Sequence, residues 1–223
     1  MLESLRTFGN TLAEITRLQG IDELHRDLHH HLGLEDTCYF FFEYTSGKDY
    51  TFSETNQLIK NLKKPPSRKE MPDYRYKRSA INHISALFSS ALNAKWLREA
   101  TLVPIPPSKK ADHPEYDDRM SQICRGIRFE GHAPDVRELV TLSNSYPASS
   151  ASGSNRISCD DLTRLYLIDE TKSLPPPTMI GIVDDVLTAG THYRAMHTVL
   201  SRRFPNATIT GLFIARRVFP DDY

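Results

Sequence analysis

The sequence predicts an α/β protein with a parallel-sheet core, and three observations lead to this prediction. Short apolar segments that suit buried strands alternate with helical patterns over residues 100–217. One of these segments runs straight into two aspartates, a turn of small residues and a helical pattern. Hydrophobic residues make up 39% of 223 residues, which is enough for one sizeable core. Alternating strands and helices are typical of right-handed βαβ units.

Four strands and two helices are expected in the core region, residues 100–223. The strands fall at residues 101–105, 136–142, 179–183 and 207–215, and the helices at 116–126 and 191–203. Residues 143–160 are rich in Ser, Asn, Gly and Pro, and we expect them to form a mobile loop. This core is a parallel-sheet, Rossmann-like arrangement.

The preceding region, residues 1–99, is expected to form a separate cap of helices and a β-hairpin. It should comprise amphipathic helices between residues 2 and 32 with a break near Gly20, a hairpin of strands at 38–44 and 50–52, and helices at 54–63 and 76–97. We therefore divide the chain into a cap at 1–99 and a core at 100–223.

Composition and charge favour a cytoplasmic protein. The formal net charge is zero, which gives no whole-chain reason to expect nucleic acid or a membrane surface as partner. The three cysteines are far apart, as expected in a reducing compartment. The start of the chain is unlike a signal peptide, and no apolar run is long enough to span a bilayer. A basic segment from Lys60 to Arg78 keeps nucleic-acid contact open as a minority alternative.

Chemistry is concentrated in the segment IGIVDDVLTAGTH, residues 180–192. Parallel sheets bind ligands at the carboxyl ends of their strands, where Asp184 and Asp185 are expected. The turn that follows leaves backbone N–H groups free at the start of the next helix, and these groups suit a phosphate. Gly190 permits close approach, and two neighbouring carboxylates can accept hydrogen bonds from the hydroxyls of a sugar. A plain strand, turn and helix start is the alternative interpretation.

The same segment resembles the signature of type I phosphoribosyltransferases. The resemblance implies that Asp184 and Asp185 hold the ribose 2′ and 3′ hydroxyls of phosphoribosyl pyrophosphate, with Mg²⁺ bound indirectly through the ribose. It also implies that the loop wraps the 5′-phosphate, and that Thr188 occupies a position where some members carry a catalytic Asp. The implied phosphate-binding residues are Thr188, Ala189, Gly190, Thr191 and His192.

The pyrophosphate is expected to meet a second loop. In the family, the turn after the first core strand contacts this group, which here points to Ser108, Lys109 and Lys110. The VPIPPSKK segment and an Arg before the next helix resemble the ComF-type branch of the family. By that resemblance, Arg119 and Arg156 are further candidates, and an Arg on a closing loop can exclude water from the diphosphate.

Two substitutions leave the reaction open. The family commonly has Thr or Ser where this chain has Ala189 and His192, and each lost hydroxyl removes a phosphate contact worth about 1 kcal/mol. A protonated His192 would compensate as a cation. We expect a phosphoribosyltransferase acting on an unnamed nitrogenous base. The alternative is a non-catalytic sensor of phosphoribosyl pyrophosphate or a nucleotide, acting as a homodimer or with a protein partner in a defence or toxin–antitoxin system.

Overall fold

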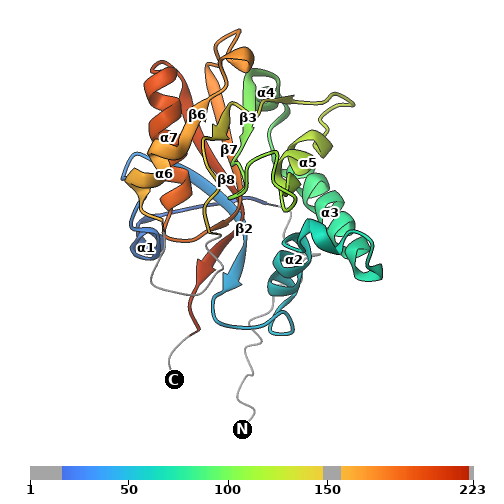
Figure 1. Cartoon of the computed structure of the whole chain (residues 1–223). Coiled ribbons are helices and arrows are strands. Elements are labelled where there is room, and N and C mark those ends of the chain that lie inside the picture. Colours follow the sequence, from blue (N-terminus) through green and yellow to red (C-terminus); the bar gives the residue numbers. More distant parts are fainter. Residues whose placement is uncertain (1–16, 148–156, 221–223) are drawn as a thin grey trace.

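The computed structural model describes residues 17–147 and 157–220, and these residues form an α/β fold around a mostly parallel sheet (Figure 1). The strand order is β1-β2-β8-β7-β3-β4, and only β1 is antiparallel to its neighbour. The α/β class and the parallel sheet predicted from the sequence are therefore confirmed. In the same residues, no helix has the length and apolar character needed to cross a membrane.

The helices and strands follow one another along the chain, with three successive α-helices between β2 and β3. They are β1 (Gln19–Gly20), α1 (Glu23–Arg26), β2 (Thr37–Thr45), α2 (Glu54–Leu62), α3 (Arg75–Ala91), α4 (Ala94–Glu99), β3 (Ala100–Pro104), α5 (Arg119–Gly126), β4 (Asp135–Val136), β5 (Val140–Leu142), α6 (Cys159–Leu165), β6 (Tyr166–Ile168), β7 (Met179–Leu187), α7 (Thr191–Arg203) and β8 (Thr208–Val218). Strands β5 and β6 pair with each other in a separate small sheet.

Helices cover both faces of the large sheet, which explains why its central strands are apolar on both sides. Helices α2, α3 and α5 pack on one face, and α6 and α7 lie on the other (Figure 1). Successive residues of a strand point to opposite faces. Accordingly, Phe41 belongs to the first hydrophobic cluster and Phe40 to the second. This two-faced burial is the usual condition of a parallel sheet.

Strand β2 is where the structure departs most from the expectation. Its predicted hairpin with residues 50–52 is wrong, because β2 pairs in parallel with β8 and residues 50–52 form a turn before α2. Buried side chains on both faces suit the interior of a sheet better than a solvated hairpin. The buried Asn56 fixes the turn, since its amide bonds the backbone of Thr45, Lys48 and Asp49. The sheet thus draws strands from both sides of residue 99.

Several predicted elements differ in length. The long helix at 76–97 is divided at Asn93, whose side chain accepts from two backbone N–H groups and starts α4. The strand at 136–142 is split between β4 and β5. Within residues 17–32, the expected helix is reduced to α1 and a 3₁₀ turn at Asp27–His29, and β1 occupies Gln19–Gly20. Helix α6 begins inside the segment expected to be a loop, capped by Ser158.

The connections place a switch point between β3 and β7. From β3 the chain crosses through α5 to β4, and from β7 it crosses through α7 to β8 in the opposite direction along the sheet. Open parallel sheets bind their ligands in the crevice outside the carboxyl ends of two such strands. The two loops that leave this point are residues 105–118 and 188–190.

Candidate functional site

The loop after β7 has the geometry of an anion-binding turn. Strand β7 ends at Leu187, and residues 188–190 form the bend that leads directly into α7. Gly190 is the N-cap residue and has a φ of 90°, a left-handed conformation that favours glycine. The first N–H groups of an α-helix have no partner within the helix, so those of α7 are available to a phosphate. Thr188 is exposed, and Thr191 is half-buried beside this turn.

The N-terminal segment holds this loop from behind. The ring Nδ1 of the fully buried His29 bonds the carbonyl oxygen of Thr188, and the backbone N–H of His31 donates to the carbonyl of Ala189 at 3.0 Å. Arg194 of α7 in turn donates to the carbonyl of His31. The carbonyl groups of the loop are thus bonded to the N-terminal segment. These bonds fix the loop backbone and leave its N–H groups pointing away from that segment.

The two aspartates lie on opposite faces of β7, and Asp185 is held by cations. Lys63, directly after α2, lies 3.0 Å from Oδ1 of Asp185, and Arg119 donates to Oδ2 through Nη2 at 2.6 Å and Nε at 3.2 Å. Burial alone would raise the pKa of Asp185. The positive charges of Lys63 and Arg119 outweigh burial and hold this pKa well below its usual range.

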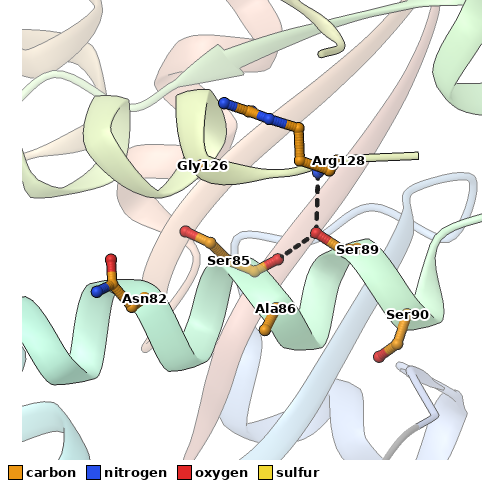
Figure 2. A pocket seen from close by; sticks show the side chains of 7 residues that line it. All are labelled: Asn82, Ser85, Ala86, Ser89, Ser90, Gly126 and Arg128. Atoms are coloured by element: carbon orange, nitrogen blue, oxygen red, sulfur yellow. Dashed lines mark hydrogen bonds between the residues drawn. The ribbon is translucent and has the colours of Figure 1, made fainter. Parts of the chain in front are cut away.

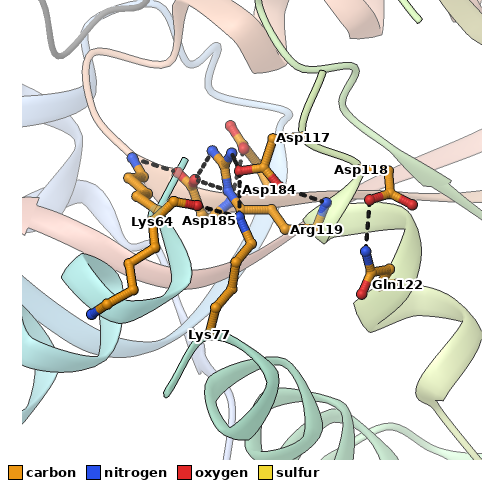
Figure 3. Close-up of polar contacts among 9 residues, drawn as sticks. Lys64, Lys77, Asp117, Asp118, Arg119, Gln122, Asp184 and Asp185 are labelled. Carbon is orange, nitrogen blue, oxygen red and sulfur yellow. Dashed lines mark hydrogen bonds and ion pairs between the residues drawn. The ribbon is translucent and has the colours of Figure 1, made fainter. Parts of the chain in front are cut away.

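The ion pairs continue away from Asp185 into the protein (Figure 3). Arg119 also donates to Asp117 at 2.8 Å, and the same oxygen of Asp117 accepts from Lys77 of α3 at 2.7 Å. The Lys77 side chain is 2% exposed and donates a further hydrogen bond to the carbonyl of Lys64. Burial lowers the pKa of Lys77, and Asp117 opposes that effect. This ion network joins α2, α3, α5 and β7.

Asp184 lies in different surroundings, on the side of α6 and α7. Its Oδ1 accepts the backbone N–H of Asp185 at 2.7 Å. Burial, and then the negative charge of Asp185, raise the pKa of Asp184 to about 7. Two buried tyrosines, Tyr146 and Tyr166, lie near Asp184. Burial raises their pKa values, and the negative charge of Asp184 raises them further. The carboxyl of Asp184 is therefore harder to ionise than that of a solvent-exposed aspartate.

His192 lies beside one of these tyrosines, and its burial favours the neutral imidazole. Its Nε2 lies 3.3 Å from the hydroxyl of Tyr146. Burial lowers the pKa of His192 to about 4. Burial thus opposes the expected role of His192 as a cation, and that role stays a prediction for the phosphate-bound state. A neutral imidazole can still donate one hydrogen bond to a phosphate.

The loop between β3 and α5 carries the residues expected at the pyrophosphate. Ser108, Lys109 and Lys110 are half-buried near its start, and Arg119 begins α5 at its end. The carbonyl of Ser108 accepts from the N–H of Tyr146, and the N–H of Lys110 donates to Ser145. The structure thus brings Arg119 to the aspartates, whereas Ser108 and Lys110 are anchored to the segment after β5. Arg156 lies outside the described residues.

The space beside the loop is small. A cavity of about 10 Å³ is lined by residues 186–188 and 190–193 with Asp184 and Phe213. That volume accommodates roughly one water molecule, far below the several hundred Å³ of ligand pockets. A ligand larger than water would therefore have to bind from the open side or displace side chains that line this cavity.

A wider hollow of about 490 Å³ lies elsewhere, between α3 and the end of α5 (Figure 2). It is open to solvent and lined mainly by small polar side chains of α3. Ser89 accepts the backbone N–H of Arg128 and donates to the carbonyl of Ser85, as Figure 2 shows. The helices are close here, since a Cβ on Gly126 would lie 2.4 Å from the hydroxyl oxygen of Ser85. The hollow contains none of the predicted site residues.

The residues around Asp185 do not fit a directly bound Mg²⁺. Magnesium requires oxygen ligands at about 2.0–2.1 Å. Both carboxylate oxygens of Asp185 already contact cations, and Oδ1 of Asp184 accepts an N–H. Within residues 17–147 and 157–220, no cluster of three or more His, Cys, Asp or Glu side chains is arranged to hold a metal ion.

Sequence reasoning missed Lys63 and Lys77 as members of this site, although a signal exists. Lys77 precedes Ile81 by four positions and occupies the buried face of its helix pattern, whereas Lys63 follows α2 at the rim and carries a weaker signal. A cation on an apolar face indicates a buried partner. His29 and Tyr146 carry no such signal, because tertiary structure alone brings them to the site.

The chain was also compared with known proteins. No model of a known protein family matches it, and no curated protein matches it either.

Proposed function

We propose that this protein binds a 5′-phosphorylated ribose, either phosphoribosyl pyrophosphate or a nucleotide, and transfers phosphoribose to a nitrogenous base. One observation carries the proposal: the 188–192 turn and the acid pair Asp184–Asp185 lie together at the switch point of a parallel sheet. Helix N-termini bind phosphate, and carboxylates at strand ends accept sugar hydroxyls.

In the proposed reaction, a ring nitrogen of the base attacks C1 of the ribose. The new N–C1 bond forms as the C1–O bond to the diphosphate breaks, the electron pair leaves with the diphosphate, and the proton of the nitrogen passes to solvent. The protein contributes position and charge: the loop fixes the 5′-phosphate, Asp185 orients the ribose, and nearby cations stabilise the departing diphosphate. Lys109, Lys110 and Arg119 are the proposed contacts to that group.

A second candidate function is binding without turnover, in a sensor or regulator. Two features of the site favour it specifically. The cavity beside the loop is about 10 Å³, and the acid best placed for a ribose is engaged by Lys63 and Arg119. A neutral His192 also supplies less attraction for phosphate than a cation would.

Calorimetric titration with ribose 5-phosphate tests the shared first step. Thr191→Ala should weaken binding about tenfold, because it removes a hydroxyl donor to a charged acceptor. Thr198→Ala is the matched control: Thr198 is on the same helix, and its hydroxyl bonds the carbonyl of Arg194 instead. Equal effects of the two variants, or no binding by the unaltered protein, would refute the phosphate loop.

Pyrophosphate release separates enzyme from sensor. The protein is incubated with phosphoribosyl pyrophosphate and a panel of bases, with and without Mg²⁺. Release that depends on a base and disappears in Asp185→Asn supports transfer. Binding with no release from any base supports the sensor.

A further inference from the structure

Asp185 is the starting point, because each of its carboxylate oxygens already has a cationic partner. Lys63 contacts Oδ1 at 3.0 Å, and Arg119 contacts Oδ2 at 2.6 Å. The two cations come from different parts of the chain: Lys63 follows α2 and Arg119 begins α5. The Asp185 side chain is 7% exposed, so these contacts form largely away from bulk water.

The balance of charge around Asp185 favours an anionic ligand over a metal cation. Within the ion pairs themselves, Lys63, Lys77 and Arg119 contribute three positive charges, and Asp117 and Asp185 contribute two negative ones. The neighbouring Asp184, whose pKa is raised, adds only part of a further negative charge. A divalent cation placed here would be repelled by neighbours at a few ångströms in a partly desolvated site. A diphosphate brought to the same point would gain from them.

We propose that Lys63 and Arg119 serve in place of a divalent cation, so that this site binds phosphoribosyl pyrophosphate without Mg²⁺. The inference rests on the proposed function and specifies its ligand state. When the ribose hydroxyls bind Asp185, the two cations are released from it and pair with the diphosphate. Lys63 is suited to this move, because its side chain is 38% exposed at the rim, whereas that of Arg119 is 19% exposed and held by Asp117.

Titration calorimetry on the whole chain tests this inference with two probes, phosphoribosyl pyrophosphate and ribose 5-phosphate. Each is titrated once in EDTA and once in excess Mg²⁺. For the unaltered protein, the Kd of phosphoribosyl pyrophosphate should differ by less than about threefold between the two buffers. Ribose 5-phosphate, which has no diphosphate, provides the reference for the loop alone.

Variants of Lys63 link the result to the named residue. Lys63→Met is unbranched, one atom shorter than lysine and uncharged, and it should weaken phosphoribosyl pyrophosphate binding in EDTA about tenfold. Mg²⁺ should restore part of that loss, and ribose 5-phosphate should change less than about threefold. Lys63→Arg should behave like the unaltered protein. Lys60→Met, at an exposed position of α2, is the matched control and should change neither probe.

The outcomes distinguish two failures. If ribose 5-phosphate binds but phosphoribosyl pyrophosphate gains tenfold or more from Mg²⁺ in the unaltered protein, the inference is wrong and the proposed function stands. Equal binding by Lys63→Met and the unaltered protein in EDTA would also overturn it. If neither probe binds in either buffer, the proposed function fails and the inference fails with it. Thermal melting of each variant identifies any loss of binding caused by unfolding.

Discussion

The two faces of the sheet at the end of β7 treat the same residue type in opposite ways. On the face of α2 and α5, Asp185 is ionised between Lys63 and Arg119, with its pKa held well below the usual range. On the face of α6 and α7, Asp184 lies near buried tyrosines, and its pKa rises to about 7. The alternation of a strand separates neighbouring carboxyls into an ionic face and a protonatable one. Pairs of titratable groups with divergent pKa values are typical of functional sites.

The largest expected effect concerns the ionic face. Asp185→Asn should lower the free energy of unfolding by roughly 3 kcal/mol at pH 7, because it leaves Lys63 and Arg119 with too little negative charge. Urea denaturation measures this change. The exposed pair of Arg98 and Glu130 provides the control, since Glu130→Gln should cost less than about 0.5 kcal/mol. If both variants lose equally little, the ionic face has no special role.

The protonatable face should reveal itself through pH. The folded pKa of Asp184, about 7, lies above its unfolded value, so folding favours the proton and stability from this group falls as pH rises from about 4 to about 7. In Asp184→Asn the side chain cannot ionise, so this fall in stability with rising pH should be absent. Compared with the unaltered protein, the variant should gain about 2 kcal/mol between about pH 5.5 and about pH 7.5. Parallel urea curves at the two pH values that show a constant difference would contradict the assignment.

A smaller effect is expected at the loop that belongs to the protonatable face. Gly190→Ala should cost about 1 to 1.5 kcal/mol, because φ at this residue is 90° and the new Cβ would lie 3.4 Å from atoms of His31 and Leu32. Gly47→Ala has a similar φ in open space and should be destabilised comparably. Only the change at Gly190 should also weaken binding of ribose 5-phosphate in calorimetry. Identical binding by both variants would show that the 188–190 loop does not bind this ligand.

The smallest expected effect concerns the hydroxyl of Tyr146 on the protonatable face. Tyr146→Phe removes the buried hydroxyl 3.3 Å from His192 and should cost about 0.5 to 1 kcal/mol in urea denaturation. The exposed Tyr50 is the control, and Tyr50→Phe should change stability by less than about 0.5 kcal/mol. A loss at Tyr146 no larger than at Tyr50 would mean that its hydroxyl contributes nothing to the pocket.

Local patterns were enough to predict the central part of this molecule. The apolar run before Asp184 and Asp185 predicted the start of β7, and the helical spacing after Gly190 predicted both bounds of α7. Strand β7 continues four residues beyond its expected end, through the two aspartates to Leu187. These elements depend on neighbours in sequence, through strand burial and helix start signals. The structure places Arg119 in contact with Asp185, and its role at the pyrophosphate stays a prediction.

The pairing of strands that are far apart in sequence could not be predicted from local patterns. The aromatic run of β2 predicted a strand, but nothing local distinguishes a hairpin partner from β8, about 170 residues further on. His29 reaches the carbonyl of Thr188 only because the N-terminal segment packs behind the loop. The lowered pKa of His192 likewise follows from burial, which is a property of the assembled fold.

The position of β2 has a consequence for the synthesis of the protein. Residues 37–45 pair with residues 210–218, so the sheet lacks an inner strand until almost the entire described chain has left the ribosome. The aromatic side chains of β2 are therefore exposed for much of translation, when unpaired apolar strands are prone to aggregate. Contacts so distant in sequence also slow folding. The turn at residues 188–190 depends on a contact of similar range, since His29, 159 residues away, bonds the carbonyl of Thr188.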